Sequence, residues 1–321
     1  MKIHTVRLPE AGKIDVIERE LPAPREGEVL IKTSQSSICG TDKNIYQGIL
    51  PPGRTFPITL LGHEGGGIVV EAGRGTRRYK AGDRVMSCKN NGTFADYFLA
   101  EEDYLHRVPE EMDMDLGSLG EPLACVMYSI FNSGVQLGDV VAVMGLGFAG
   151  QLMAQGARRK GALRVIGLDP LAGKRELARN LGADEVFDPG APGAEERVMD
   201  LTRGKGVDVV FEAAGREDSM NMATRILKKN GILVLYSWVM EPIRLLISRW
   251  HDDAIDIRTT CVMHKNTPYE RFAWFDRLLQ PYWQGLIQVR PLLSEPVPLK
   301  DIARGFEIAS RPDTIKVVIR E

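Results

Sequence analysis

The chain has 321 residues, about twice the length of an ordinary domain, so one large domain or two ordinary ones are expected. Hydrophobic residues make up 44% and charged residues 26%, which is typical of a soluble globular protein and excludes a disordered or collagen-like chain. A net charge of −2, without a long basic stripe, argues against nucleic acid and anionic membrane surfaces as partners.

The sequence favours a cytoplasmic location. The first residues, MKIHTVRLPEAGKIDV, lack the apolar stretch and cleavage site of a secretory signal. Residues 140–157 approach the minimum length of a membrane span, but four glycines and a place between a predicted strand and a predicted helix argue against one. The cysteines are scattered without a CxxC pair, which favours reduced thiols over a disulfide framework; they are Cys39, Cys88, Cys125 and Cys261.

The pattern of predicted secondary structure changes twice along the chain. Up to about residue 120, segments such as GEVLIKTSQS, GGGIVVEAG, GDRVMSC and TFADYFLA predict a mostly antiparallel β region with long loops. From about residue 138, apolar strands alternate with amphipathic helices, from DVVAVMG to GILVLYSW, which predicts a parallel sheet covered on both faces. After about residue 262 the alternation stops. A helix over 270–279 and the strands VRPLL and TIKVVIRE are expected there, the last strand pairing with the first region.

A glycine-rich turn follows the first strand of the alternating region and opens a helix: Gly145, Leu146, Gly147, Phe148, Ala149 and Gly150. This GxGxxG permits a tight turn, close approach of a pyrophosphate and close helix–strand packing, with the helix N-terminus facing the phosphates. Asp169, at the end of the next strand, is suited to accept hydrogen bonds from the adenosine ribose and to repel a 2′-phosphate. NAD is therefore expected rather than NADP. Lys174 and Arg175 could reach a 2′-phosphate, but we interpret them as a solvated helix face.

Three segments of the first region carry residues that bind metals. They are ICGTD with Cys39, GHEGGG with His63 and Glu64, and GEPLAC with Glu121 and Cys125. A thiolate, an imidazole and carboxylates make a plausible catalytic zinc site that leaves a position for substrate. Each residue also has a structural explanation: a buried thiol, a turn cap or the start of a helix. Spacing alone does not decide between these interpretations.

In this order, and followed by the glycine fingerprint, these segments resemble the zinc-dependent medium-chain dehydrogenase/reductase superfamily, the alcohol and sorbitol-type polyol dehydrogenases. The resemblance extends along essentially the whole chain, through GEVLIK, ICGTD, GHEGGGIVVEAG, GEPLACV, VMGLGFAG, DVVFEAAG and TIKVVI. It implies an α/β fold: a GroES-like catalytic domain over residues 1–121 and 264–321, and a Rossmann dinucleotide-binding domain with a doubly wound parallel sheet over 122–263. It also implies a homodimer or homotetramer.

The resemblance assigns roles residue by residue. Cys39 and His63 match zinc ligands, and Glu121 matches the position where polyol dehydrogenases have Glu and simple alcohol dehydrogenases have Cys. Glu64 matches a carboxylate that is a ligand in sorbitol-type members and a neighbouring or exchanging group in others. Thr41 matches the hydroxyl that passes the substrate proton toward solvent, although a Thr here could equally cap a helix.

Further matches are weaker or incomplete. Asp42 matches the acid that orients the histidine ligand. Cys125 lies four residues beyond the ligand position and is interpreted as a buried helix thiol. Between Val85 and Phe94 only MSCKNNGT remains of the lobe that carries a structural zinc in many relatives, so one zinc per chain is expected.

A second departure concerns proton release. Asn44 stands where several relatives carry a relay histidine, and an amide cannot act as a base at neutral pH. The proton is then expected to leave through ribose hydroxyls and water. His251 is a speculative alternative, since its surroundings, SRWHDD, also suggest an ordinary polar loop.

The resemblance, with Glu121 in place of a cysteine, implies a zinc-dependent oxidoreductase that transfers hydride between a secondary alcohol and NAD, the alcohol being a polyol, sugar or cyclitol. The small-molecule alcohol or ketone would be its main partner. Alternatives are an L-threonine-type amino-alcohol dehydrogenase, a zinc-free quinone or enoyl reductase, and a non-enzymatic nucleotide-binding protein of the same fold.

Overall fold

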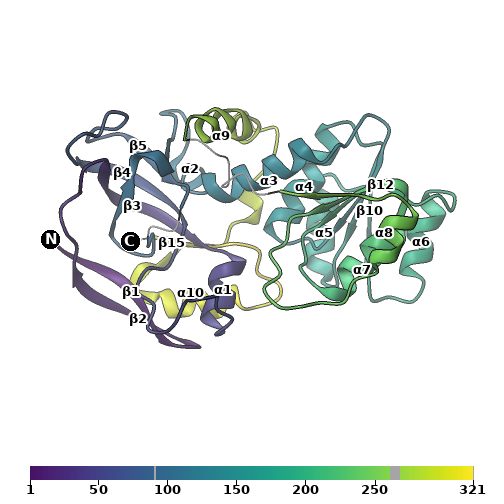
Figure 1. Cartoon of the computed structure of the whole chain (residues 1–321), viewed down its shortest axis with the longest axis horizontal. Helices are drawn as coiled ribbons and strands as arrows, with labels where there is room; N and C mark the ends of the chain where they lie inside the picture. Colours follow the sequence, from purple (N-terminus) through teal and green to yellow (C-terminus); the bar gives the residue numbers. More distant parts are fainter. Residues whose placement is uncertain (90–91, 261–267, 321) are drawn as a thin grey trace. The chain divides into compact units, whose positions relative to one another are not determined.

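The structure, a computed structural model, describes residues 1–89, 92–260 and 268–320, without the side chains of 268–274. Cys261 lies outside this part of the chain. The chain divides into two units (Figure 1): Met1–Ala124, Met263–Leu279 and Arg290–Glu321 form the first, and Cys125–Val262 with Gln280–Val289 the second.

The first unit is built from a β-hairpin and a mostly antiparallel sheet. The hairpin pairs β1 (Lys2–Glu10) with β2 (Lys13–Glu20). The sheet has the order β14-β15-β3-β4-β5-β7, and β6 pairs with β3. Its strands are β3 (Glu28–Ile38), β4 (Glu64–Ala72), β5 (Arg84–Ser87), β6 (Tyr97–Glu101), β7 (Leu105–Arg107), β14 (Val297–Pro298) and β15 (Val317–Arg320).

Short helices connect these strands and cover the sheet. They are α1 (Gly40–Tyr46), η1 (Glu102–Tyr104), α2 (Met114–Gly117), η3 (Arg290–Leu292), η4 (Leu299–Asp301) and α10 (Ile302–Ala309). Phe306 of α10 and Phe94 are fully buried in one apolar cluster, where their rings meet edge to face at 6.0 Å. This cluster also contains Ile38, so it supports the end of β3 from which the candidate site begins.

The C-terminal strand pairs with the first region, as the sequence predicts. β15 is antiparallel to β3, with Val317 opposite Ile38. The predicted strand VRPLL is wrong, because Arg290–Leu292 form the 3₁₀ helix η3. Pro291 lacks the N–H that a strand would need for its ladder, which favours the helical turn.

The second unit is a six-stranded parallel sheet with the order β10-β9-β8-β11-β12-β13. Counted along the chain this order is 3-2-1-4-5-6, the doubly wound arrangement. The strands are β8 (Val140–Met144), β9 (Arg164–Leu168), β10 (Glu185–Phe187), β11 (Val207–Glu212), β12 (Leu227–Leu235) and β13 (Asp256–Thr259). GILVLYSW therefore supplies an interior strand, β12, and the edge strand next to it is β13.

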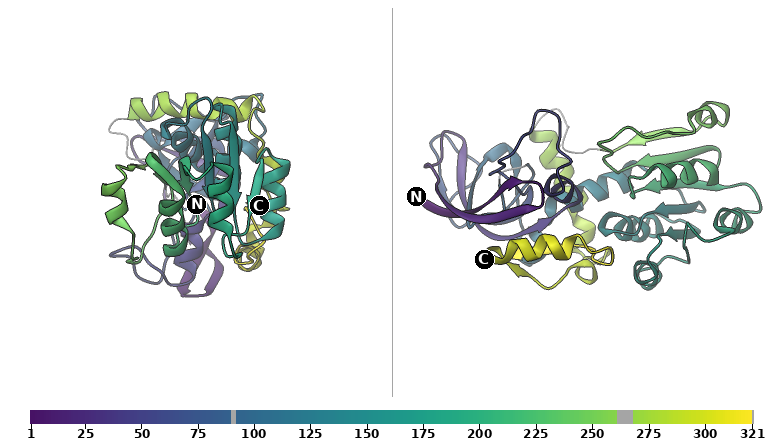
Figure 2. Two further views of the ribbon diagram at one scale, coloured as in Figure 1. Left: turned by 90° about the vertical axis from the view of Figure 1, so that its right-hand side faces the viewer. Right: turned by 90° about the horizontal axis from the view of Figure 1, so that it is seen from below.

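Helices cover both faces of this sheet, as Figure 2 shows. The helices of this unit are α3 (Gly120–Asn132), which runs from the first unit into the second, α4 (Phe148–Arg159), α5 (Ala172–Asn180), α6 (Ala194–Leu201), α7 (Glu217–Ile226) and α8 (Ile247–Asp252). The last residues of α9 (Pro268–Trp283) also belong to it. Inward-facing strand residues such as Ala142, Ile166 and Val210 are fully buried between these layers. The continuous apolar strands of the sequence thus follow from burial on both faces.

Residues 280–289 group with the second unit, whereas the sequence places them in the first domain. A pair of hydrogen bonds ties this segment to α4. Gln155 Nε2 donates to the Gln288 carbonyl at 3.0 Å, and the Gln288 amide donates to Gln155 Oε1 at 2.7 Å. Such a contact, between residues far apart in sequence, leaves no periodic trace in either segment.

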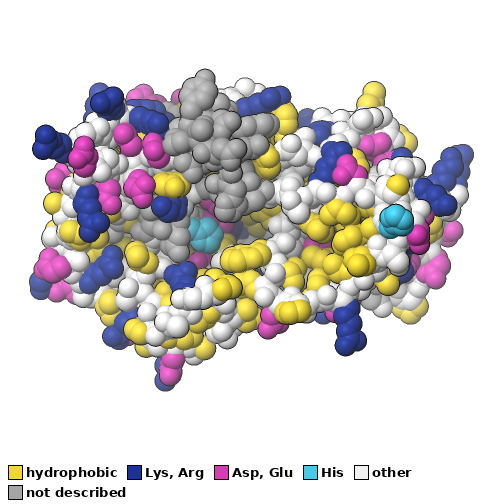
Figure 3. Space-filling model, in the orientation of Figure 1, with side chains coloured by type: hydrophobic (Ala, Val, Ile, Leu, Met, Phe, Trp, Pro, Cys, Tyr) yellow, Lys and Arg dark blue, Asp and Glu magenta, His cyan; other side chains and the backbone are white. Residues whose placement is uncertain are grey.

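The surface is mixed in charge. On the face drawn in Figure 3, basic and acidic side chains are interspersed rather than gathered into a field of one sign. Among the described helices, none is both long and apolar enough to cross a bilayer.

Candidate active site

Cys39 lies where β3 gives way to α1, and it caps that helix. Its sulfur accepts a hydrogen bond from the Thr41 amide at 3.1 Å, and its own amide donates to Asp42 Oδ2 at 3.0 Å. These reciprocal bonds satisfy amides that a helix N-terminus leaves unpaired. The capping role therefore belongs to Cys39 rather than to Thr41, and the thiol is held in one place by the helix it starts.

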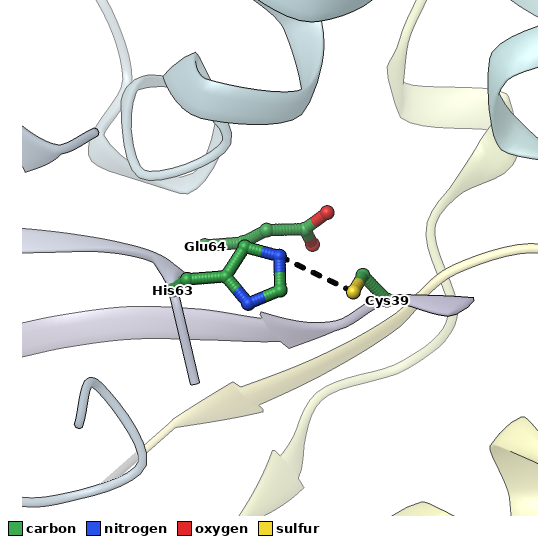
Figure 4. A group of neighbouring side chains, drawn as sticks. All are labelled: Cys39, His63 and Glu64. Atoms are coloured by element: carbon green, nitrogen blue, oxygen red, sulfur yellow. Dashed lines mark hydrogen bonds between the residues drawn. The ribbon is translucent and has the colours of Figure 1, made fainter. Parts of the chain in front are cut away.

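Glu64 is the first residue of β4, next to the end of β3, and His63 immediately precedes it. The turn before them needs a glycine: Gly62 has φ +93°, and a Cβ there would lie 2.9 Å from the Phe94 amide nitrogen. Cys39, His63 and Glu64 each offer a ligand atom, and these atoms all lie within 4.8 Å of one another. Figure 4 shows the imidazole facing the thiol, with the Glu64 carboxylate beside them.

The Glu64 carboxylate is buried and held by two neighbours that the sequence did not indicate. Ser37 Oγ donates to Oε2, and Lys316 Nζ lies 2.5 Å from the same oxygen. The side chains of Lys316 and Glu64 are each only 4% exposed, so this is a buried ion pair. Strand pairing brings the three together: Ser37 of β3 is opposite Glu64 of β4, and Lys316 immediately precedes β15 on the other side of β3.

The charges of this cluster act strongly on one another. Burial raises the pKa of the Cys39 thiol, and the nearby Asp42 carboxylate raises it further. Burial also raises the pKa of Asp42 itself. Burial alone would lower the pKa of His63, but the negative charges of Cys39 and Asp42 raise it well above its ordinary value. Each of these pKa shifts favours a protonated form, and ligand protons must leave when a divalent cation binds.

The donor set fits zinc. Cys39 Sγ and His63 Nε2 are 3.3 Å apart, close to the roughly 3.5 Å that separates a sulfur and a nitrogen ligand on one tetrahedral zinc ion. The other ring nitrogen of His63, Nδ1, faces away from the thiol and lies 3.7 Å from Asp42 Oδ1. A carboxylate at this place orients a histidine ligand. Cys39, His63 and Glu64 would therefore hold the ion.

Glu121 and Cys125 are not part of this three-residue group. Glu121 lies in the first turn of α3, and its charge contributes to the raised pKa of His63. Its assignment as a ligand stays a prediction. Cys125 lies further along the same helix. Burial raises the pKa of Tyr282, and the charge of Cys125 raises it further, which places this thiol near the tyrosine.

The glycine turn between β8 and α4 has the geometry that a dinucleotide site requires. Gly145 has φ +87°, and a Cβ on Gly150 would lie 1.8 Å from the Gly145 carbonyl oxygen, so neither position accepts a side chain. A Cβ on Gly147 would meet no protein atom within 4 Å. The space beside Gly147 is therefore open at the N-terminus of α4, which starts at Phe148 and continues through Ala149. A pyrophosphate fits such a place.

Asp169 lies behind this turn and ties it to the end of β9. Its Oδ2 accepts from the Leu146 amide and its Oδ1 from the Leu171 amide, both at 2.9 Å. Each carboxylate oxygen keeps a further lone pair for a ribose hydroxyl. Arg175 is not on a freely solvated face, because Nη1 donates to the carbonyls of Asp169 and Pro170 at 2.7 Å.

Asn44 and His251, the two residues that concern proton release, both lie on short helices. Asn44 lies on α1, and its carbonyl accepts from the Ile49 amide at 2.9 Å. His251 lies exposed on α8 in the second unit. The route of the proton stays a prediction from the sequence.

Comparison with known proteins identifies the family of this chain. Residues 25–110 match the alcohol dehydrogenase GroES-like domain and residues 149–277 the zinc-binding dehydrogenase family. A sorbitol dehydrogenase of Halalkalibacterium halodurans is 32% identical and covers 68% of this chain and 72% of its own length. D-arabitol-phosphate dehydrogenase of Enterococcus avium is 26% identical over 99% of this chain and 97% of its own. A Sinorhizobium meliloti protein crystallised with NADP is 28% identical, with a TM-score of 0.87 over all of both chains.

The fold and the site define a two-domain dehydrogenase with a GroES-like domain and a Rossmann-like six-stranded parallel sheet. The chain belongs to the zinc-binding medium-chain dehydrogenases, a family of NAD- or NADP-linked alcohol and polyol oxidoreductases.

Proposed function

We propose that this protein is a zinc-dependent oxidoreductase that transfers hydride between a secondary alcohol and NAD, the alcohol being a polyol, sugar or cyclitol. The observation that carries the proposal is the convergence of Cys39, His63 and Glu64 on one point of the first unit. A carboxylate-rich ligand set, completed by Glu121, favours polyols. The relatives named sorbitol and D-arabitol-phosphate dehydrogenase support the same substrate class.

Each residue has a role in this proposal. A bound zinc ion supplies a Lewis acid that lowers the pKa of the substrate hydroxyl, and the nicotinamide accepts the hydride. Cys39, His63, Glu64 and Glu121 hold the ion, and Asp42 keeps the His63 ring in its orientation. Thr41 accepts a hydrogen bond from the substrate hydroxyl and relays the proton toward ribose hydroxyls and water. The products are a ketone, NADH and one proton.

The cofactor and the assembly are proposed as follows. Asp169 favours NAD over NADP, because a carboxylate at the adenosine ribose repels a 2′-phosphate. The engaged guanidinium of Arg175 supports this preference, since its two carbonyl bonds hold it against the backbone. One zinc per chain and a homodimer or homotetramer complete the proposal.

The proposal is tested by following NADH formation on a panel of polyols, cyclitols, sugars and amino alcohols, with NAD and with NADP. We expect turnover on one of the first three groups, with NAD preferred, and its loss after zinc is removed with a chelator. Restoring zinc should restore the rate. Turnover confined to amino alcohols would reject the substrate class, and activity that survives complete zinc removal would reject the metal mechanism.

The open space beside Gly147 gives a separate test of the nucleotide site. Gly147→Val should weaken NADH binding by tenfold or more, roughly, because the new side chain fills the place where the pyrophosphate approaches. Folding should be little affected, since φ is −72° and a Cβ at this position meets no protein atom within 4 Å. Gly150→Val should instead destabilise the fold. Fluorescence titration with NADH and thermal unfolding measure both effects, and unchanged NADH affinity in Gly147→Val would place the pyrophosphate elsewhere.

A further inference from the structure

The strand order of the second unit predicts where each half of a dinucleotide would bind, at the edge of the sheet formed by the carboxyl ends of its strands. The order reverses between β8 and β11, and the cofactor lies across that point. The glycine turn after β8 serves the pyrophosphate, and β9 and β10 lie on the adenosine side. The half formed by β11, β12 and β13 is left for the nicotinamide nucleotide.

Glu212, the last residue of β11, is fully buried at this edge. Its Oε1 accepts from the amides of Ala214 at 3.1 Å and Gly215 at 3.0 Å and from Ser219 Oγ at 2.7 Å. Its Oε2 accepts from Ser237 Oγ at 2.6 Å and from the Gly215 amide at 3.3 Å. Within the described part of the chain no ion pair involves Glu212, so hydrogen-bond donors alone compensate for its burial.

These bonds join three elements at one place. Ala214 and Gly215 form the turn after β11, Ser219 lies in the first turn of α7, and Ser237 follows β12. The backbone carbonyl of Glu212 adds to the junction, since it accepts from the Tyr236 amide at 3.1 Å. A single side chain therefore fixes the carboxyl ends of two neighbouring strands and the start of the helix between them.

The turn that Glu212 organises lies against the glycine turn. The Ala213 amide donates to the Met144 carbonyl at 2.9 Å, and a Cβ on Gly145 would lie 2.9 Å from the Ala214 nitrogen. Ala214 is exposed and Ala213 half-buried, whereas Glu212 beneath them is fully buried. Because the N–H and C=O of a trans peptide point in opposite directions, the carbonyls of Ala213 and Ala214 face away from the Glu212 carboxylate.

We propose that Glu212 is a positioning residue for the nicotinamide half of the cofactor. It acts through the 213–215 turn and the end of β12, which it holds as one rigid surface beside the pyrophosphate turn, and it does not touch the cofactor itself. An apolar side chain would satisfy burial at this position, but it could not draw two backbone amides and two hydroxyls to one point. This inference rests on the proposed NAD-linked function.

The test compares NADH with ADP-ribose, which lacks the nicotinamide. Glu212→Gln keeps the size of the side chain but replaces one acceptor oxygen with a donor. The amide cannot accept all the bonds that converge here. We expect the dissociation constant for NADH to rise about tenfold or more, because hydrogen bonds to a buried carboxylate are lost, and that for ADP-ribose to stay within about twofold. Zinc content should be unchanged.

Asp208→Asn is the matched control. Asp208 lies at the amino end of the same strand, away from the nucleotide edge, where Oδ2 accepts from the Val140 amide at 2.7 Å and Oδ1 pairs with Lys228. This variant should lower thermal stability and leave the ratio of the two dissociation constants unchanged. If Glu212→Gln does not fold, Ser237→Ala should show a smaller loss of the same NADH-selective kind.

Each result separates the inference from the proposed function. Parallel weakening of NADH and ADP-ribose by Glu212→Gln would show a general structural role, and no change in either would show that Glu212 does not affect cofactor binding. Both outcomes overturn the inference alone. A folded wild-type protein that binds neither ligand would overturn the NAD-linked function, and the inference with it.

Discussion

Replacement of Cys39 by serine is expected to remove zinc from the protein and to lower turnover by about a thousandfold, since a Lewis acid contributes several kcal/mol to the transition state. Serine is the informative substitution because Cys39 also caps α1. A serine hydroxyl preserves a helix cap, whereas alanine would add a loss of about 0.5–2 kcal/mol in stability. Metal analysis of the purified protein, together with steady-state rates, measures the effect.

Cys125→Ser is the control for this experiment. It removes a thiol that lies outside the group of Cys39, His63 and Glu64, and it should leave one zinc per chain and the turnover of the wild type. Retention of a full equivalent of zinc by Cys39→Ser would contradict the ligand assignment. Loss of zinc from Cys125→Ser would instead indicate that Cys125, on α3, is a zinc ligand.

Lys316→Met is expected to destabilise the metal-free protein by about 3–5 kcal/mol, because it leaves the Glu64 carboxylate buried without its cation. The double variant Lys316→Met/Glu64→Gln should recover most of that loss, since no charge then stays uncompensated. Denaturant unfolding in the presence of a chelator measures both. With zinc bound the single variant should lose less, because the divalent ion provides the missing positive charge.

Lys2→Met tests an exposed pair of the same kind in the same unit. Lys2 Nζ lies 2.6 Å from Glu18, with side chains 67% and 51% exposed, so a loss below about 1 kcal/mol is expected. Simple addition of the effects of Lys316→Met and Glu64→Gln in the double variant would show that the two residues are not coupled and would refute the ion-pair argument.

Features written in local patterns could be predicted from the sequence. Alternating apolar strands and helices indicate the parallel sheet, and the fingerprint from Gly145 to Gly150 marks its nucleotide turn. Cys39 and His63 stand in short motifs, so their convergence with Glu64 was predictable by resemblance. The pairing of β15 with β3 was predictable because TIKVVIRE is an apolar strand with no local neighbour.

Features that depend on distant contacts could not be predicted. Lys316 carries no motif, and only the register of β15 beside β3 brings it to Glu64. The sequence offers one clue to its role: Lys316 is the single lysine at the start of TIKVVIRE, a strand that pairs with the strand leading to Cys39. Glu212 closes an apolar strand, and nothing in VDVVFE shows that four donors converge on its carboxylate. β13 is only four residues long, with little apolar alternation, so the edge of the sheet was missed.

The pairing of Lys316 with Glu64 has a consequence for the order of synthesis. The two residues are 252 positions apart, and the whole second unit is translated between them. A nascent chain that has completed its first 124 residues holds the Glu64 carboxylate without its lysine and lacks the strand that flanks β3. Domains usually fold as the ribosome releases them, N-terminal first. Here most of the nucleotide-binding unit leaves the ribosome before Lys316 does, so the ion pair that compensates the Glu64 charge is completed only at the end of synthesis.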